Sequence, residues 1–191
     1  WRMGRNIPVG GGGTKFALIP EGISRAVLAE IVGPFEEETP WGTKDKCFMV
    51  FQSEHKVTDE ESDFFDQRIT ARYYATYTMG TEEYPSNLRK QIEGWKGRTM
   101  SDEELFDLDI DVLVGKPCKL LVSHEPKKGG GSKQVLTVKP PGPKEEWMTL
   151  DKYTTVSERE AAKTQAAAQE ENVEALKGPQ DDEAWVFAAS R

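Results

Sequence analysis

The order of the predicted strands and helices constrains the fold of this chain more than any other feature of its sequence. Five short runs are rich in β-branched or aromatic residues and end at glycine, proline or acidic residues, which predicts five strands. They span residues 23–32, 46–52, 67–78, 118–124 and 134–139. The third is the clearest, because Arg68, Arg72 and Tyr74 alternate with mainly apolar residues. In a strand these two sets of residues lie on opposite faces.

Helical patterns occur between the third and fourth predicted strands. Leu88, Ile92 and Trp95 follow one another at the spacing that places residues on one helical face. Ser101, followed three residues later by Glu104, is a capping-box pattern that predicts the start of a second helix. We interpret the basic residues of this region as its solvated side, with a phosphate-binding patch as the alternative. They are Arg89, Lys90, Lys96 and Arg98.

Three strands, a helical connector and two further strands match the OB-fold, a partly open Greek-key barrel of five strands. A ferredoxin-like arrangement would need a helix between the first two strands, and the sequence has no helical pattern there. We therefore predict a mostly β protein: a five-stranded OB-fold barrel with helices between strands three and four, plus a helical C-terminal tail.

The composition divides the chain into three parts. Residues 1–18 contain four consecutive glycines, which are costly to order, and predict a flexible N-terminal arm. Residues 19–143 hold the predicted OB-fold domain. Residues 144–191 form a helical and acidic tail, in which residues 157–176 predict a helix from their content of alanine, glutamate and glutamine.

The formal net charge of −8 neither supports nor excludes a polyanionic partner, because the distribution of charge matters more than its sum. Many acids fall in two runs, 36–38 and 59–63, which we predict to be loops. No run approaches ~18 apolar residues, so no transmembrane helix is expected, and no secretory signal is visible at the start. Cys47 and Cys118 stand far apart and predict buried thiols in a reducing compartment such as the cytoplasm.

The sequence carries no group of residues that predicts catalysis. His55 and His124 stand singly, and together with the two cysteines they lack the short paired spacings of metal sites. Asp107, Asp109 and Asp111 alternate as in a calcium loop, but the required glycine and glutamate are missing. No nucleophile elbow, zinc-protease or kinase motif is present. We therefore predict a protein that is not an enzyme and needs no metal or cofactor.

The predicted barrel places cationic and aromatic residues where OB-folds bind oligonucleotides. This surface lies over strands two and three, between the loop that joins strands one and two (loop 1-2) and the loop that joins strands four and five (loop 4-5). Sequence-tolerant binding of a single strand needs a cationic groove for phosphates and aromatic faces on which bases stack. The sequence predicts such contacts from both loops and both strands. They are Trp41, Lys44, Lys46, Phe48, Arg68, Arg72, Tyr74, Lys127, Lys128 and Lys133.

Some of these aromatic residues have structural alternatives. As alternatives to stacking on a base, Trp41 would cover one end of the barrel, and Tyr74 would pair across strands at the surface. Phe48 joins the interface only if Met49 and Phe51 face the core. The core side of strand three is expected to hold two tyrosines, Tyr73 and Tyr77.

The connector and the entry into strand four resemble a known family. Residues 88–98 (LRKxIExWxGR), 106–108 (FDL) and 113–118 (LVGKPC) are similar to a phage-associated OB-fold family of single-stranded DNA-binding or replication proteins. The resemblance spans roughly residues 19–141. It implies a fold and a functional class, but it assigns no contact residue.

The end of the chain, where acidic residues adjoin aromatic ones, resembles the partner-recruiting tips of bacterial single-stranded DNA-binding proteins. The residues concerned are Asp181, Asp182, Glu183, Trp185 and Phe187. The expected function is to coat and protect single-stranded DNA during phage or mobile-element replication or recombination, in the host bacterial cytoplasm if the chain is phage-encoded. The tail would dock replication or recombination proteins. The alternatives are an OB module that recruits replication partners without binding nucleic acid, and an RNA-binding OB domain.

Overall fold

A computed structural model describes residues 17–40, 42–62, 64–127, 130–143, 146–162, 164 and 165. Packing divides the chain into two units, Trp1–Tyr153 and Thr154–Arg191, of which the first contains the sheet. In the second unit, residues 156–162, 164 and 165 are helical, and the rest of the predicted tail helix lies outside the described residues. None of the helices described has the length and apolar character needed to cross a membrane.

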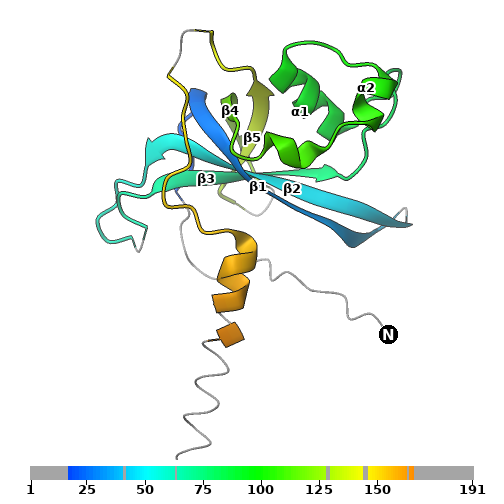
Figure 1. Ribbon diagram of the computed structural model, residues 1–191. Coiled ribbons are helices and arrows are strands. Elements are labelled where there is room, and N and C mark those ends of the chain that lie inside the picture. The colour runs from blue at the N-terminus through cyan, green and yellow to red at the C-terminus, as the bar shows by residue number, and fades with distance from the viewer. Residues whose placement is uncertain are drawn as a thin grey trace, which may run out of the picture. The chain divides into compact units, whose positions relative to one another are not determined.

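Five antiparallel strands form one sheet in the order β3-β2-β1-β4-β5 (Figure 1). The strands are β1 (Gly22–Thr39), β2 (Gly42–Lys56), β3 (Arg68–Thr76), β4 (Pro117–Pro126) and β5 (Ser132–Lys139). All five predicted strands are confirmed, and the protein is mostly β. Within the described part of the chain the sheet is open, because β3 and β5 are its two edges and are not paired with each other.

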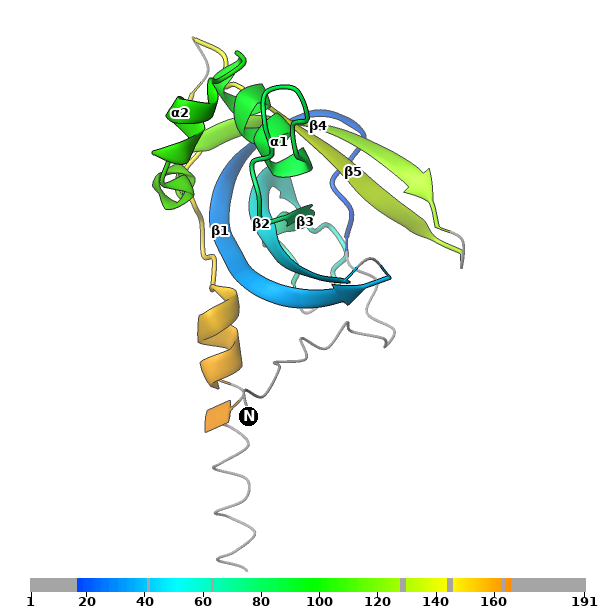
Figure 2. The ribbon, with the colours of Figure 1, turned by 90° about the vertical axis from the view of Figure 1, so that its right-hand side faces the viewer.

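β1 and β2 form a hairpin that is longer than predicted. The prediction that Glu36–Glu38 lie in a loop is wrong, because these residues belong to β1. The register places Glu37 opposite Lys44, and Lys46 Nζ lies 3.7 Å from a carboxylate oxygen of Glu37. Opposite charges facing each other across two strands favour their pairing. Two register shifts interrupt the β1–β2 ladder, and Figure 2 shows β1 strongly curved.

Three helical elements lie between β3 and β4, as predicted. They are α1 (Asn87–Lys96), α2 (Asp102–Phe106) and the short 3-10 helix η1 (Ile110–Leu113). Ser101 and Glu104 form the predicted capping box at the start of α2. α1 packs against both edge strands of the sheet, β3 and β5, so that it covers the gap between them (Figure 2).

The core lies between the sheet and α1. Leu88, Ile92 and Trp95, which the sequence placed on one face of α1, are all buried there. The indole Nε1 of Trp95 donates a hydrogen bond to the carbonyl of Pro117 at 3.0 Å, which satisfies its one polar atom. The helix therefore joins the core through the face that the helical period predicted.

The strands alternate between a core face and an outer face. Met49 and Phe51 of β2 belong to the core, as predicted. Tyr73 of β3 packs against the core and is partly buried, which confirms the prediction that it lies on the core side of this strand. The prediction for Tyr77 is wrong: β3 ends at Thr76, and Tyr77 is 40% exposed.

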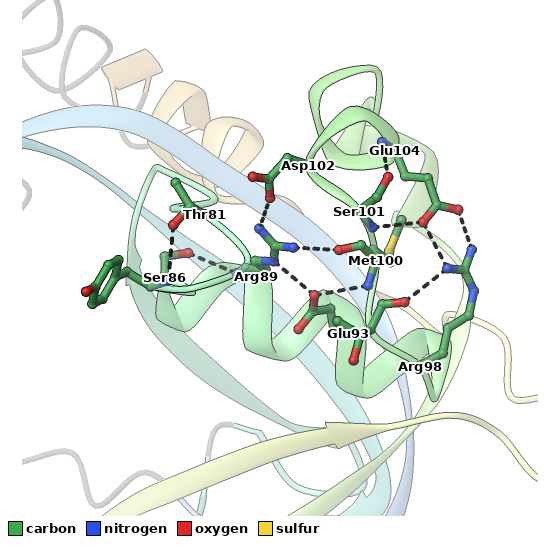
Figure 3. Close-up of polar contacts among 11 residues, drawn as sticks. Thr81, Ser86, Arg89, Glu93, Arg98, Met100, Ser101, Asp102 and Glu104 are labelled. Atoms are coloured by element: carbon green, nitrogen blue, oxygen red, sulfur yellow. Dashed lines mark hydrogen bonds and ion pairs between the residues drawn. The ribbon is translucent and has the colours of Figure 1, made fainter.

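Arg89 lies inside the helical connector, so neither sequence interpretation, a solvated residue or a phosphate contact, is right for it (Figure 3). Its Nε donates to Glu93 Oε1 at 2.9 Å, its Nη1 to Asp102 Oδ1 at 2.5 Å, and its Nη2 to the carbonyl of Met100 at 2.5 Å. Hydrogen bonds to Asp102 and then Glu93 raise the pKa of Arg89. The arginine thus ties α1 to the start of α2.

Candidate nucleic-acid interface

The predicted contact residues of β2 and β3 lie on the face of the sheet opposite the core, called here the outer face. The register pairs Phe48 with Tyr74 and Val50 with Arg72. Residues directly opposite each other in antiparallel strands project to the same side. Because Met49, the neighbour of Phe48, points into the core, these four side chains all point outward.

Arg72 and Tyr74 are both seated on Phe48. The guanidinium carbon of Arg72 lies 4.9 Å from the centroid of the Phe48 ring, and the Tyr74 ring centroid lies 5.2 Å from it at an interplanar angle of 43°. Phe35 of β1 packs edge-on against the same ring, with centroids 6.0 Å apart. Phe48 is 1% exposed, whereas Tyr74 is 60% exposed. We call these four residues the Arg72–Tyr74 patch.

The patch joins an open aromatic ring to a delocalised cation. The cation–π contact holds the guanidinium over Phe48, and the packed ring limits the freedom of Tyr74. Among the residues described, no acidic side chain forms an ion pair with Arg72. Phe48 is too deeply buried to stack on a base, so its predicted direct contact becomes a supporting role for its two neighbours.

The two lysines predicted in loop 1-2 lie in β2, because the register pairs Thr39 with Gly42 and leaves only a short turn between the strands. Lys46 is half-buried, and its ammonium lies 3.7 Å from Glu37. Lys44 is exposed and stands opposite Glu37 in the ladder. The acidic end of β1 therefore offsets part of the positive charge predicted at this edge of the interface.

Arg68, at the other end of β3, is bonded to residues 146–153, which we call the strap (Figure 1). Its Nη1 donates to the carbonyl of Thr149 at 2.7 Å, and its Nε lies 3.9 Å from a carboxylate oxygen of Asp151. The side-chain amide of Gln52 accepts from the N–H of Asp151 at 2.8 Å and donates to its carbonyl at 2.6 Å. The composition predicts these residues as part of the tail, whereas packing groups them with the unit that contains the sheet.

The remaining predicted basic contacts lie on the β4–β5 hairpin or outside the described residues. Lys127 is exposed, and Lys133 forms an ion pair of 2.8 Å with Glu125. Figure 2 shows the free ends of the β1–β2 and β4–β5 hairpins projecting toward the same side. Trp41 and Lys128 lie outside the described residues, so their roles stay predictions. The same holds for the tail residues Asp181, Asp182, Glu183, Trp185 and Phe187.

Sequence reasoning missed Phe35 and the strap. Phe35 directly precedes the acidic run of β1, and predicting a loop for that run gives Phe35 no role in the interface. The strap has no local signal, since Gln52 and its partner Asp151 are 99 residues apart. The role of Phe35 could therefore have been inferred from the sequence, whereas the docking of the strap could not.

Other chemistry is sparse in the part of the chain that the structure describes. It contains no group of three or more side chains placed to hold a metal ion. A cavity of about 210 Å³ beside α1 and η1 is lined by two carboxylates, Asp109 and Asp111, among mostly apolar residues. Burial raises the pKa of the Cys47 thiol and raises that of Cys118 to about 12, so both thiols are protonated at neutral pH.

Comparison of the sequence with models of known protein families and with curated proteins gives no match. The function is therefore inferred from the geometry of the outer face.

Proposed function

We propose that this protein is a non-enzymatic single-stranded DNA-binding protein with a sheet of the OB-fold type. One observation carries the proposal: Arg72 and the 60% exposed Tyr74 lie side by side on the ring of Phe48, on the outer face of β2 and β3. The protein would coat and protect exposed strands during phage or mobile-element replication or recombination, in the host bacterial cytoplasm if the chain is phage-encoded. Its acidic and aromatic tail would recruit replication or recombination proteins.

The chemistry of the patch suits a single strand better than a duplex. In a duplex the faces of the bases are occupied by neighbouring bases, whereas a single strand can lay one base on Tyr74 while Arg72 contacts a phosphate. Stacking of this kind contributes about 1–3 kcal/mol per base and tolerates any sequence, because every base has a π face. The open part of the patch therefore favours coverage of a strand over recognition of a sequence.

The topology supports the OB-fold part of the proposal. In a partly open Greek-key barrel of five strands, the edge strands approach each other without a complete ladder. Here β1 lies between β2 and β4, and α1 packs against both edge strands. This arrangement leaves the outer face of β2 and β3 on the side of the sheet away from the helix.

Fluorescence anisotropy with labelled oligothymidylate, duplex DNA and RNA over a salt series tests the proposal. We expect preference for the single-stranded DNA, with the logarithm of the affinity falling linearly with the logarithm of the salt concentration. Tyr74→Ala should weaken binding about 5- to 150-fold with little change in the salt slope. Arg72→Ala should reduce the slope by about 0.7, the value for one phosphate contact on a single strand.

Two control variants match these changes in chemistry but not in position. Tyr84→Ala removes a tyrosine that is 74% exposed in the segment before α1, and Lys90→Ala removes an exposed cation of α1. Both should bind like the parent. If Tyr74→Ala and Arg72→Ala also bind like the parent, the interface lies elsewhere. A parent that binds no nucleic acid refutes the function and favours the protein-interaction module, and a preference for RNA favours the RNA-binding alternative.

A further inference from the structure

The strap covers part of the outer face that continues the Arg72–Tyr74 patch, where it is bonded to Gln52 and Arg68. The register along β2 and β3 pairs Val50 with Arg72 and then Gln52 with Thr70, so the surface is continuous. Val50 and Gln52 are each only 2% exposed, although both point away from the core. Figures 1 and 2 show the chain after β5 running along the outside of the sheet, and both backbone groups of Asp151 are bonded to Gln52.

The strap is held mainly by polar contacts. Side chains of the sheet bond its backbone, as described above, and the hydroxyl of Tyr153 donates to Glu30 Oε2 at 2.8 Å. Of its own apolar side chains, Trp147 is 68% exposed and Leu150 is 39% exposed, whereas Met148 is half-buried. Because apolar burial is the main source of stable docking, a segment that leaves Trp147 and Leu150 exposed can be displaced at lower cost than one that buries all its apolar side chains.

The docked strap also contains an unfavourable backbone conformation. Lys152 has a φ of 48°, in the left-handed region that residues with a Cβ atom rarely adopt. Such a conformation persists only where surrounding contacts impose it. Release of the strap would relieve this strain and partly offset the loss of its hydrogen bonds.

The strap presents to the sheet the kinds of group that a nucleic-acid strand would present. The Asp151 carboxylate lies 3.9 Å from Arg68 Nε, where a phosphate would meet the same cation. The Gln52 amide bonds one donor and one acceptor of the strap backbone, an arrangement that also fits the edge of a base. The covered residues Gln52 and Arg68 thus have the chemistry to bind the same ligand as the open patch.

We propose that the strap is an intramolecular cover that a bound single strand of DNA displaces, which lengthens the interface from the Arg72–Tyr74 patch to Gln52 and Arg68. The inference rests on the proposed function. The open patch would make the first contact, and the strand would then replace the strap along β2 and β3. Displacement makes the apparent affinity depend on how firmly the strap is docked.

Hydrogen exchange of the unmodified full-length protein, with and without saturating oligothymidylate, tests the displacement directly. The amide of Asp151 is bonded to Gln52 in the free protein and should be protected. We expect its exchange to become at least about tenfold faster when DNA is bound, because the bond that protects it is broken. Amides in the ladder between β1 and β4 should not change, which controls for general loosening.

A strap-side double variant, Asp151→Asn with Tyr153→Phe, tests the cover without altering the sheet. It removes the carboxylate near Arg68 and the hydroxyl bonded to Glu30. We expect it to bind oligothymidylate about five- to tenfold more tightly than the parent, since a net hydrogen bond corresponds to a factor of about five. Glu60→Gln with Tyr84→Phe is the matched control, because it makes the same changes in charge and hydroxyl content at exposed positions elsewhere.

The outcomes separate this inference from the proposed function. Asp151 that stays protected while DNA is bound overturns the inference and leaves the function standing, as does equal binding by the double variant and its control. The exchange measurement uses the unmodified protein, so it still decides the matter if a variant does not fold. Absence of single-stranded DNA binding by both the parent and the double variant refutes the function itself.

Discussion

Gln91 is predicted to make an essential contact between α1 and the free edge of β5. Its Nε2 donates to the carbonyl of Leu136 at 3.2 Å, and its Oε1 accepts from the N–H of Val138 at 2.7 Å. In an antiparallel strand, the carbonyl of residue i and the N–H of residue i+2 point to the same side of the strand. The glutamine side chain therefore takes the place of a neighbouring strand, at the edge where β5 has no strand partner in the described part of the chain.

The variant Gln91→Leu removes both hydrogen bonds and keeps a side chain of similar size. Gln91 is 7% exposed, so water has little access to the two backbone groups left behind. Each buried group without a partner costs about 1–3 kcal/mol, and the added apolar burial returns about 1 kcal/mol. We expect a net loss of about 1–5 kcal/mol, which is a substantial fraction of the roughly 5–15 kcal/mol that is typical of a domain.

Equilibrium unfolding in guanidinium chloride, followed by circular dichroism and tryptophan fluorescence, measures this loss. Gln134→Leu, also on β5, is the matched control, because the amide nitrogen of Gln134 is buried without a hydrogen-bond partner among the described residues. That variant should be neutral or slightly stabilising. A loss below about 1 kcal/mol for Gln91→Leu, or an equal loss in the control, would refute the reasoning, since the unmet backbone groups alone should cost more.

Two further predictions concern the helical connector. Gly94→Ala should lower the free energy of unfolding by about 1–3 kcal/mol in the same assay, although alanine favours helix, because its Cβ would lie 2.6 Å from the carbonyl oxygen of Val138; a more stable variant would contradict this. The hydrogen bond from Arg98, then that from the N–H of Ser101, lowers the pKa of Glu104 from 4.5 to about 2. Its contribution to stability should be complete above pH 4.5 and disappear as the pH falls to about 2. The stability difference between the parent and Glu104→Gln should shrink over that interval, and a difference independent of pH would count against the assignment.

The elements that were predicted correctly have sequence patterns that extend over a few neighbouring residues. The alternation around Arg72 and Tyr74 defined β3 and its outward parity, and the spacing of Leu88, Ile92 and Trp95 defined the buried face of α1. Both are consequences of the strand and helix periods, which act over a few residues. Two predictions failed at charged residues: the acidic run of β1 is exposed but belongs to a strand of a hairpin, and Arg89 is buried among Glu93 of its own helix, the Met100 carbonyl and Asp102 of the next helix.

The sequence alone determined the number and order of the strands, the place of the helices and the side of β3 that carries arginine and tyrosine. Tertiary structure alone decided which part of that side is open: Arg72 remains exposed, whereas Arg68, four residues earlier on the same face, is bonded to the strap. Local hydrogen bonding and alternation set the direction of a side chain within its strand. Whether that side chain meets solvent depends on packing with a distant segment, as when Asp151 docks on Gln52 from 99 residues away, and no local pattern encodes such a contact.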